Sequence, residues 1–282
     1  MLNFLTSSIK RKIAQVIGFL LFLRTRRRNF SINNLRAAFP RKSKSEIRRI
    51  GRLSMTGMVD FFFEVINIPK IAKNSGKFIE THGEEYVWKA LEEKKGLILV
   101  LAHFGNWELM GVAAAAKGIP IHAIGKPVKN PFIYNYIKRL RGSTGLRNID
   151  RKGAVKKTIQ LLKENQVVAV LLDAHAKSGF VNVDFFGRQA ATFRFPAMLA
   201  LKYGTPIIPT FYYRERDKRS ILAFGEPFPL IQTGDFQADL TANTQQYVAT
   251  LEHEIRKRPS DWTLWGHNRW RQEAVQPLSE EN

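Results

Sequence analysis

Two apolar runs in the sequence each end in a side chain that can carry a proton. Leu97–Ala102 (LILVLA) leads directly into His103, and Val167–Leu172 (VVAVLL) leads into Asp173. Short continuous apolar runs of this kind are typical of strands buried on both faces of a parallel sheet. In such sheets the active site lies at the carboxyl ends of the strands, in the loops that enter helices. His103 and Asp173 are therefore the first residues to consider for chemistry.

The loop after the first run contains a further candidate, Glu108, five residues beyond His103. Gly105 allows a tight turn, and Asn106 is suited to cap the helix that follows. Two residues five apart within one helix point about 140° away from each other, but across a strand–turn–helix corner they can meet. Glu108 could then hold His103 in one tautomer while the other ring nitrogen accepts a proton. A capped helix start with a hydrogen-bonded histidine is the alternative that these residues leave open.

Other common catalytic patterns are absent from the sequence. There is no Gly-x-Ser-x-Gly elbow, no P-loop and no Gly-x-Gly-x-x-Gly fingerprint. His253-Glu254 is followed by Lys257 where a zinc-protease helix needs its second histidine. The chain has no cysteine, which excludes thiolate nucleophiles and Cys-based metal sites. If His103 is a base without a protein nucleophile, the nucleophile is a substrate hydroxyl or amine that attacks an activated acyl group.

The block His103–Glu108 (HFGNWE) resembles the His-x4-Asp/Glu signature of the lysophospholipid and glycerol-phosphate acyltransferases. The chain as a whole is similar to their lipid A biosynthesis branch, over about residues 30–271 in colinear order. The further blocks that carry the resemblance are Asn34–Pro40, Ile149–Gly153, Leu172-Asp173, Asp184–Arg188, Tyr203–Pro209 and the tail Trp262–Trp270.

The resemblance implies roles for individual residues. His103 would be the general base on the acceptor hydroxyl, and Glu108 would be its orienting partner. The residues implied to contact substrate are Asn106, Lys126, Arg151 and Asp173. Among these, Arg151 would bind an anionic group of the acceptor or donor, and Asp173 would help to place the acceptor. No metal and no resident cofactor is expected, because the acyl group arrives on acyl carrier protein or coenzyme A.

Two positions depart from the family's usual pattern. Ala174 stands where relatives usually have Gln or His, and Lys126 stands where they usually have Arg. Lys126 keeps the positive charge but lacks the planar fork that grips a phosphate at two points. The tryptophans at positions 262, 265 and 270 are expected to be core or interfacial anchors without a part in the chemistry.

The apolar periodicity predicts an α/β fold with a mostly parallel sheet flanked by helices, which the resemblance makes glycerol-phosphate acyltransferase-like. A helix is predicted from near Ser43, where Ser43 and Glu46 fit a capping box, to Pro69. Further helices are predicted over 84–94, 109–117, 154–164, 197–203 and 241–256, and further strands over 120–124, 207–212 and 221–224.

The chain of 282 residues has a net charge of +21, and the excess is concentrated at the amino end. Residues 1–52 contain 14 Lys and Arg against one acidic residue, and cations flank the apolar stretch Ile13–Leu23. As a helix this stretch rises only about 16 Å against a hydrocarbon core of roughly 30 Å, so an interfacial helix fits better than a span. Arg-rich sequence after the apolar run disfavours a cleaved signal peptide. The alternative is an amphipathic helix packed on its own domain.

We therefore expect a membrane-associating helix over residues 1–30, an acyltransferase domain over 31–271 and a polar tail over 272–282. The expected reaction transfers a fatty acyl chain from a thioester to a hydroxyl of an anionic glycolipid. We expect it on the cytoplasmic face of the bacterial inner membrane, with the protein peripheral or monotopic. A lipid A precursor is the leading acceptor, and a phosphatidylinositol mannoside, another glycolipid or a lysophospholipid is the alternative. Acyl carrier protein, which is acidic, is an expected partner.

A basic protein with a pI near 10.3 could instead bind nucleic acid. However, the sequence has no helix-turn-helix, zinc-finger or RNA-recognition signature, and its amino-terminal cations flank an apolar run instead of alternating with stacking aromatics. No nucleic-acid partner is therefore expected. A membrane-bound scaffold without activity is a third alternative, and the presence of His103, Glu108, Arg151 and Asp173 disfavours it.

Overall fold

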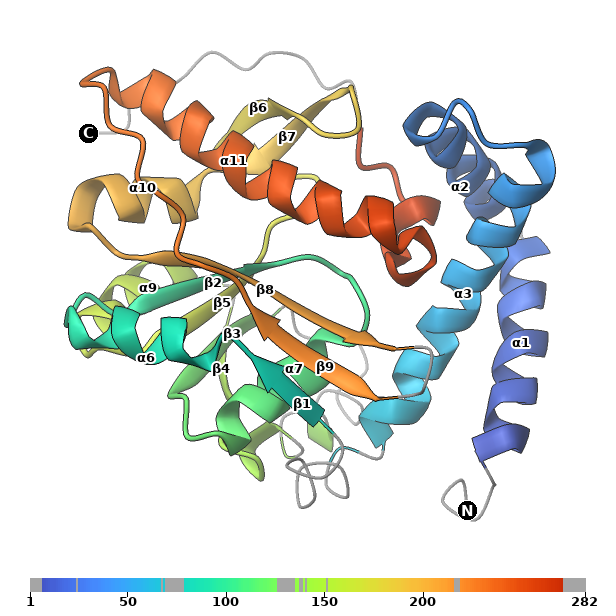
Figure 1. Cartoon of the computed structure of the whole chain (residues 1–282), viewed down its shortest axis with the longest axis horizontal. Coiled ribbons are helices and arrows are strands. Elements are labelled where there is room, and N and C mark those ends of the chain that lie inside the picture. The colour runs from blue at the N-terminus through green and yellow to red at the C-terminus, as the bar shows by residue number, and fades with distance from the viewer. Residues whose placement is uncertain are drawn as a thin grey trace.

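The computed structural model describes residues 7–23, 25–66, 68, 79–125, 135–136, 139, 141–150, 152–215 and 219–270. Within these residues a central sheet of seven strands has the order β1-β9-β8-β2-β5-β3-β4 (Figure 1). Neighbouring strands are parallel except β8 and β9, which are antiparallel. The strands are β1 (Ile79–His82), β2 (Leu97–Leu101), β3 (Ile121–Gly125), β4 (Arg147–Asp150), β5 (Val167–Leu171), β8 (Ile207–Arg214) and β9 (Ser220–Phe224). The predicted α/β class with a mostly parallel sheet is confirmed.

Helices cover both faces of this sheet, and an antiparallel hairpin of β6 (Phe180–Asp184) and β7 (Gln189–Phe193) lies outside it. The helices are α1 (Ser7–Leu23), α2 (Thr25–Ala38), α3 (Lys44–Ile66), α6 (Glu84–Glu92), α7 (Trp107–Ala116), α9 (Ala154–Lys163), α10 (Phe195–Tyr203) and α11 (Phe236–Lys257). Two short 3-10 turns, η2 (Pro259–Asp261) and η3 (Thr263–Gly266), follow α11.

Alternate side chains of the central strands belong to two separate cores, one on each face of the sheet. On β2, Leu97, Leu99 and Leu101 pack with α6 and α7, whereas Ile98 and Val100 pack with α9, α10 and α11. This alternation follows from the two-residue period of a strand and explains why the whole run is apolar. Residues that directly follow two paired strands lie beside each other in the same register. The register of the sheet therefore decides which side chains meet at its carboxyl edge.

Most predicted elements lie where the apolar pattern placed them. The capping box is present, because the Ser43 N–H donates to Glu46 Oε2 (2.8 Å) and the Glu46 N–H donates to Ser43 Oγ (3.3 Å). The last long helix begins at Phe236, earlier than predicted, because Asp235 caps it by accepting from the N–H groups of Gln237 and Ala238. The strands β1, β4, β6 and β7 were not predicted, since their short sequences mix polar and apolar residues.

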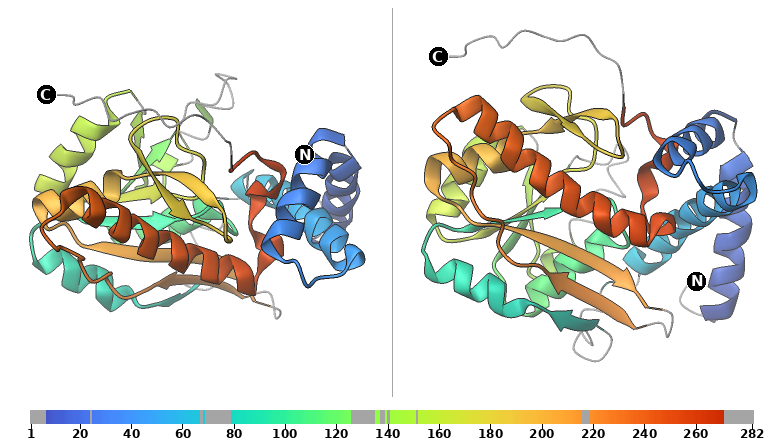
Figure 2. Two further views of the ribbon diagram at one scale, coloured as in Figure 1. Left: turned by 90° about the horizontal axis from the view of Figure 1, so that it is seen from above. Right: turned by 45° about the horizontal axis from the view of Figure 1, so that its top comes forward.

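The amino-terminal helices lie together at one end of the molecule, on the side toward which β8 runs (Figures 1 and 2). α1 packs against α3 in the opposite direction, with Gly18 beside Thr56 and Phe22 beside Gly51. A Cβ atom on Gly18 would lie 2.6 Å from Cα of Thr56, so the glycine is what allows the two backbones to approach this closely.

The outward face of α1 is also apolar. Val16 is 60% exposed and Leu20 is 58% exposed, and Ile9, Ile17, Phe19 and Leu23 are exposed as well. The helix is thus packed on its own domain by one face and presents a second apolar face to the surroundings. Among the described residues, no helix is both long enough and apolar enough to cross a bilayer. The predicted association of this helix with a membrane surface stays a prediction.

Candidate active site

The parallel pairing of β2 and β5 brings His103 and Asp173 together. The two strands pair from Leu97 with Val167 to Leu101 with Leu171, a constant offset of 70 residues. His103 and Asp173 differ by the same 70 residues and follow their strands at the same position. His103 Nδ1 lies 2.8 Å from Asp173 Oδ1. The register of two neighbouring strands therefore creates a histidine–carboxylate pair.

The Asp173 carboxylate is enclosed and accepts three hydrogen bonds. Its Oδ2 atom accepts from the main-chain N–H of His103 (2.7 Å) and from Nε1–H of Trp262 (2.6 Å). Burial alone would raise the pKa of this carboxyl, but the His103 imidazole and the hydrogen-bond donors outweigh burial and hold the pKa below its usual value. Asp173 is thus an ionised, oriented acceptor for His103.

The His103 imidazole is largely buried, with 23% of its side chain exposed. Burial alone would lower its pKa, but the charge of Asp173 and the hydrogen bond to it outweigh burial and raise the pKa above the usual value. With Nδ1–H donating to Asp173, Nε2 is the ring nitrogen that can accept a proton. No other side chain in the described part of the chain bonds to Nε2. His103 has the arrangement of a general base with a carboxylate behind it.

Glu108 does not take the position that the sequence analysis expected for it. Arg141 binds its carboxylate with two nitrogens, Nε–H donating to Oε2 (2.8 Å) and NH2 to Oε1 (2.5 Å), and donates through NH1 to Asn148 Oδ1 (2.6 Å). The orienting partner of His103 is Asp173 instead, because the strand register already places that carboxylate at Nδ1. Glu108 belongs to a second charged group in the same cavity.

Asn106 caps α7, as predicted, by accepting from the Leu109 N–H (3.0 Å). Its amide also donates to Glu64 Oε2 (2.7 Å), and Glu64 in turn pairs with Arg214 at the end of β8. Asn106 is 3% exposed. Its side-chain oxygen caps α7 and its side-chain amide links α7 to α3. The predicted contact of Asn106 with substrate stays a prediction.

Lys126 and Arg151, the two cations predicted to bind substrate, lie outside the described residues. Each immediately follows the last residue of a strand, Gly125 of β3 and Asp150 of β4. Those two last residues are paired partners in the sheet. The carboxyl ends of β3 and β4 lie at the same edge of the sheet as the His103–Asp173 pair.

A cavity of about 300 Å³ opens beside His103 on the α7 face of the sheet. Its walls are mostly apolar, with Glu108 and Arg141 as the charged exception among the described residues. The Trp107 ring stacks on Phe61 at 4.3 Å and meets the His103 ring edge-on at 4.9 Å. The remaining lining residues are Phe62, Leu101, Met110, Gly111, Ala123, Ile124, Gly125, Leu146, Asn148, Ala169 and Leu171. A long apolar group would fit here with one end at the histidine.

Sequence reasoning named His103 and Asp173 but did not pair them. The two apolar runs have the same length, and this signal could have predicted that the residues after them lie side by side. Arg141 and Trp262 had no comparable signal, because each reaches the site from a segment without catalytic features of its own. Trp262 was expected to be an anchor only, whereas its indole N–H bonds the central carboxylate.

The chain matches the family described as bacterial lipid A biosynthesis acyltransferase over residues 1–272. The phosphatidylinositol mannoside acyltransferase of Mycolicibacterium smegmatis is 24% identical over 218 residues, which cover 76% of this chain and 70% of that protein. The protein of the same name from Mycobacterium tuberculosis H37Rv is 26% identical over 209 residues, which cover 72% of this chain and 63% of that protein. The chain therefore spans roughly two thirds of the length of these curated relatives, and the resemblance seen in the sequence motifs is confirmed.

The two carboxylates of the site should differ in their effect on the pH dependence of turnover. A base must be neutral to work, so the rate rises as pH passes upward through the raised pKa of His103. Asp173→Asn removes the charge that raises this pKa, so the acid limb should move to lower pH and kcat should fall by about 10²- to 10⁴-fold. Glu108→Gln should leave the acid limb in place, because Glu108 pairs with Arg141. The measurement is kcat against pH for both variants and the wild type.

Asp235→Asn is the matched control, since asparagine caps α11 as well as aspartate does and the site is not involved. A shift of the acid limb in Glu108→Gln, with none in Asp173→Asn, would return the orienting role to Glu108.

Proposed function

Because the chain belongs to the bacterial lipid A biosynthesis acyltransferase family and is an O-acyltransferase, we propose that it acylates a hydroxyl of an anionic membrane glycolipid. The single observation that carries this proposal is the His103–Asp173 pair at the wall of an apolar cavity. A base and an acyl-sized apolar site side by side are what acyl transfer to a hydroxyl requires.

The proposed reaction uses His103 twice. Nε2 accepts the proton of the acceptor hydroxyl as its oxygen attacks the thioester carbonyl carbon, and Asp173 stabilises the imidazolium that forms. The tetrahedral intermediate collapses with cleavage of the carbon–sulfur bond. The imidazolium then gives its proton to the leaving thiolate, so the products are the acylated lipid and the free thiol. His103 ends in its starting state, and no group of the protein is consumed.

The apolar cavity is the proposed site of the acyl chain. Each buried methylene group contributes about 0.8 kcal/mol to binding, so a chain inserted beside Trp107 is held mainly by the apolar walls. Ala123 and Ala169 on the sheet and Gly111 on α7 keep the cavity open by the small size of their side chains. The thioester carbonyl then lies at the mouth, next to His103.

Among acceptors, phosphatidylinositol mannoside is supported by the names of the similar proteins, and a lipid A precursor by the name of the family. Both are anionic glycolipids, so a cation of the protein would suit either. We propose that Lys126 and Arg151 bind the anionic group, with Asn106 as a further contact. The acyl donor is a thioester of acyl carrier protein or coenzyme A, which is a substrate, and the proposed reaction needs no resident cofactor. The net charge of +21 favours an acidic carrier protein as a partner, and no nucleic acid is needed.

We propose that the protein acts on the cytoplasmic face of the bacterial inner membrane, held there by α1 and the cations around it. The exposed apolar face of α1 has no covering element among the described residues, and Arg26, Arg27 and Arg28 lie in the first turn of α2. Buried apolar side chains and cations near anionic headgroups act together in such anchors. Phe62 on α3 is 59% exposed and also lines the cavity, which suits an acyl site that opens close to the lipid.

The catalytic proposal is tested by His103→Ala. Loss of the base should reduce acyl transfer by at least about 10²-fold, while the protein still folds and still sediments with membranes. Lipids extracted from a strain that carries only the variant are compared with the wild type by mass spectrometry. One missing acyl chain on one lipid class would identify acceptor and chain length together. An unchanged lipid profile and unchanged transfer by the purified variant would contradict the mechanism.

The membrane proposal is tested by the double change Val16→Asp and Leu20→Asp on the outward face of α1. Two charges on the face proposed to enter the lipid should move the protein from the membrane pellet to the supernatant, with the partition changing by about tenfold or more. The matched control is Gln15→Asp with Asn29→Asp, which adds the same charge at exposed polar positions. Point changes are preferred to deletion of α1, because the other face of α1 packs on α3. Equal sedimentation of the two double variants would contradict the proposal.

A further inference from the structure

We propose that Trp262 is a positioning residue of the site, whose indole N–H fixes the Asp173 carboxylate so that Oδ1 faces His103. The inference rests on the proposed function of His103 as the base. The two oxygens of Asp173 are used differently: Oδ2 accepts from two donors, Trp262 Nε1–H and the His103 main-chain N–H, while Oδ1 is left for the imidazole. Two fixed donors on one oxygen prevent the carboxylate from turning about its axis.

The segment that carries Trp262 also fixes the backbone of His103. Trp262 forms an antiparallel bridge with Phe104, and the Gly105 N–H donates to the Asp261 carbonyl (3.0 Å). The N–H and the hydroxyl of Thr263 both donate to the His103 carbonyl, at 3.0 and 3.1 Å. One short segment near the end of the chain therefore determines the position of both members of the pair.

Trp262 is itself held in place. It is fully buried, and its carbonyl accepts a hydrogen bond from Ser54 Oγ of α3 at 2.6 Å. Its ring lies among Phe185, Phe186, Trp265 and Trp270, with centroid distances of 4.5 to 6.3 Å. These contacts hold the indole ring in one orientation.

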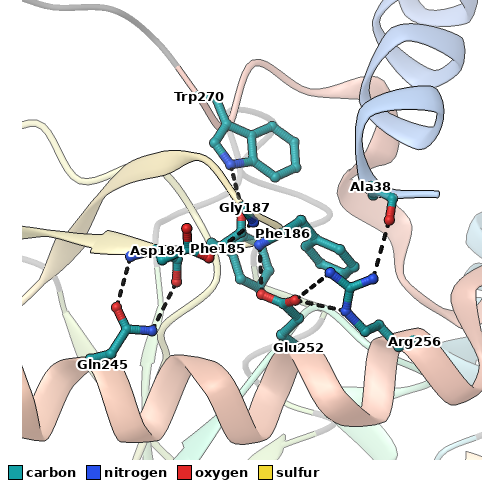
Figure 3. A network of polar contacts seen from close by, with 9 residues as sticks. All are labelled: Ala38, Asp184, Phe185, Phe186, Gly187, Gln245, Glu252, Arg256 and Trp270. Atoms are coloured by element: carbon teal, nitrogen blue, oxygen red, sulfur yellow. Dashed lines mark hydrogen bonds and ion pairs between the residues drawn. The ribbon is translucent and has the colours of Figure 1, made fainter. Parts of the chain in front are cut away.

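The aromatic neighbours are anchored by the turn between β6 and β7 (Figure 3). The Phe186 N–H donates to Glu252 of α11 at 2.5 Å, and Trp270 Nε1–H donates to the Phe185 carbonyl at 3.0 Å. Glu252 also binds Arg256, which reaches the carbonyl of Ala38 at the end of α2 (Figure 3). The cluster around Trp262 is thus tied to both α11 and the amino-terminal helices.

Loss of the indole N–H has a consequence that loss of packing does not have. With one donor fewer on Oδ2, more negative charge remains on the carboxylate, so Asp173 attracts the imidazolium more strongly. The pKa of His103 then rises further, and the carboxylate gains freedom to turn. Trp265 and Trp270 provide controls, because their indole N–H groups donate to the backbone carbonyls of Pro259 and Phe185 and not to the site.

The test compares Trp262→Phe with Trp265→Phe and Trp270→Phe in the full-length protein. Histidine titration followed by NMR should show the His103 pKa raised by about half a unit in Trp262→Phe and unchanged in the other two. With a palmitoyl thioester of coenzyme A as donor, kcat should fall about 10-fold in Trp262→Phe at unchanged KM for the donor. All three variants should lower the melting temperature, so stability alone does not distinguish them.

A second variant covers the case in which Trp262→Phe does not fold. Incorporation of 3-benzothienylalanine at position 262 keeps the fused two-ring shape and replaces the indole N–H with a sulfur atom that cannot donate a hydrogen bond. The same rise of the His103 pKa is expected there. An unchanged His103 titration in this variant, or an equal change in Trp265→Phe, would overturn the proposal. Because the titration needs no substrate, a raised pKa without any change of kcat would instead contradict the role of His103 as the base.

Discussion

The arrangement of the site depends on the in-register parallel pairing of β2 with β5. A parallel ladder with a constant offset of 70 residues leaves His103 and Asp173 side by side where both strands end. A slip of one residue would turn one of these side chains to the opposite face of the sheet. It would also move leucine, isoleucine and valine side chains between the two cores, so packing on both faces protects the register. The catalytic geometry is thus secured by the same apolar contacts that stabilise the sheet.

The buried carboxylate imposes a second constraint. An ionised side chain that is removed from water is costly unless hydrogen bonds and an opposite charge compensate for it. Asp173 receives this compensation from His103 and Trp262, which lie far apart in the sequence. The tail of the domain must therefore return to the strand edge before the site is complete. Residues 261–263 accordingly run beside the His103 loop, joined to it by an isolated antiparallel bridge and two main-chain hydrogen bonds.

The amino-terminal helices connect this site to the surroundings of the protein. α3 contributes Phe61 and Phe62 to the cavity, and Ser54 of the same helix bonds the carbonyl of Trp262. α1 lies on α3 through Gly18 and presents further apolar side chains outward. The exposed apolar face of α1, the apolar cavity and the histidine–carboxylate pair are therefore all connected through α3.

The sequence by itself determined the features that depend on neighbouring residues. The α/β class, most buried strands and helices, the capping of α7 by Asn106 and the candidacy of His103 all follow from local periodicity, turn residues and capping chemistry. Edge strands such as β4 were not predicted because their sequences contain no apolar run. Only the tertiary structure decided that Asp173 and not Glu108 orients His103, that Arg141 holds Glu108, and that Trp262 completes the site. These pairings join residues up to 89 positions apart, and they depend on strand order and register, which local sequence patterns do not specify.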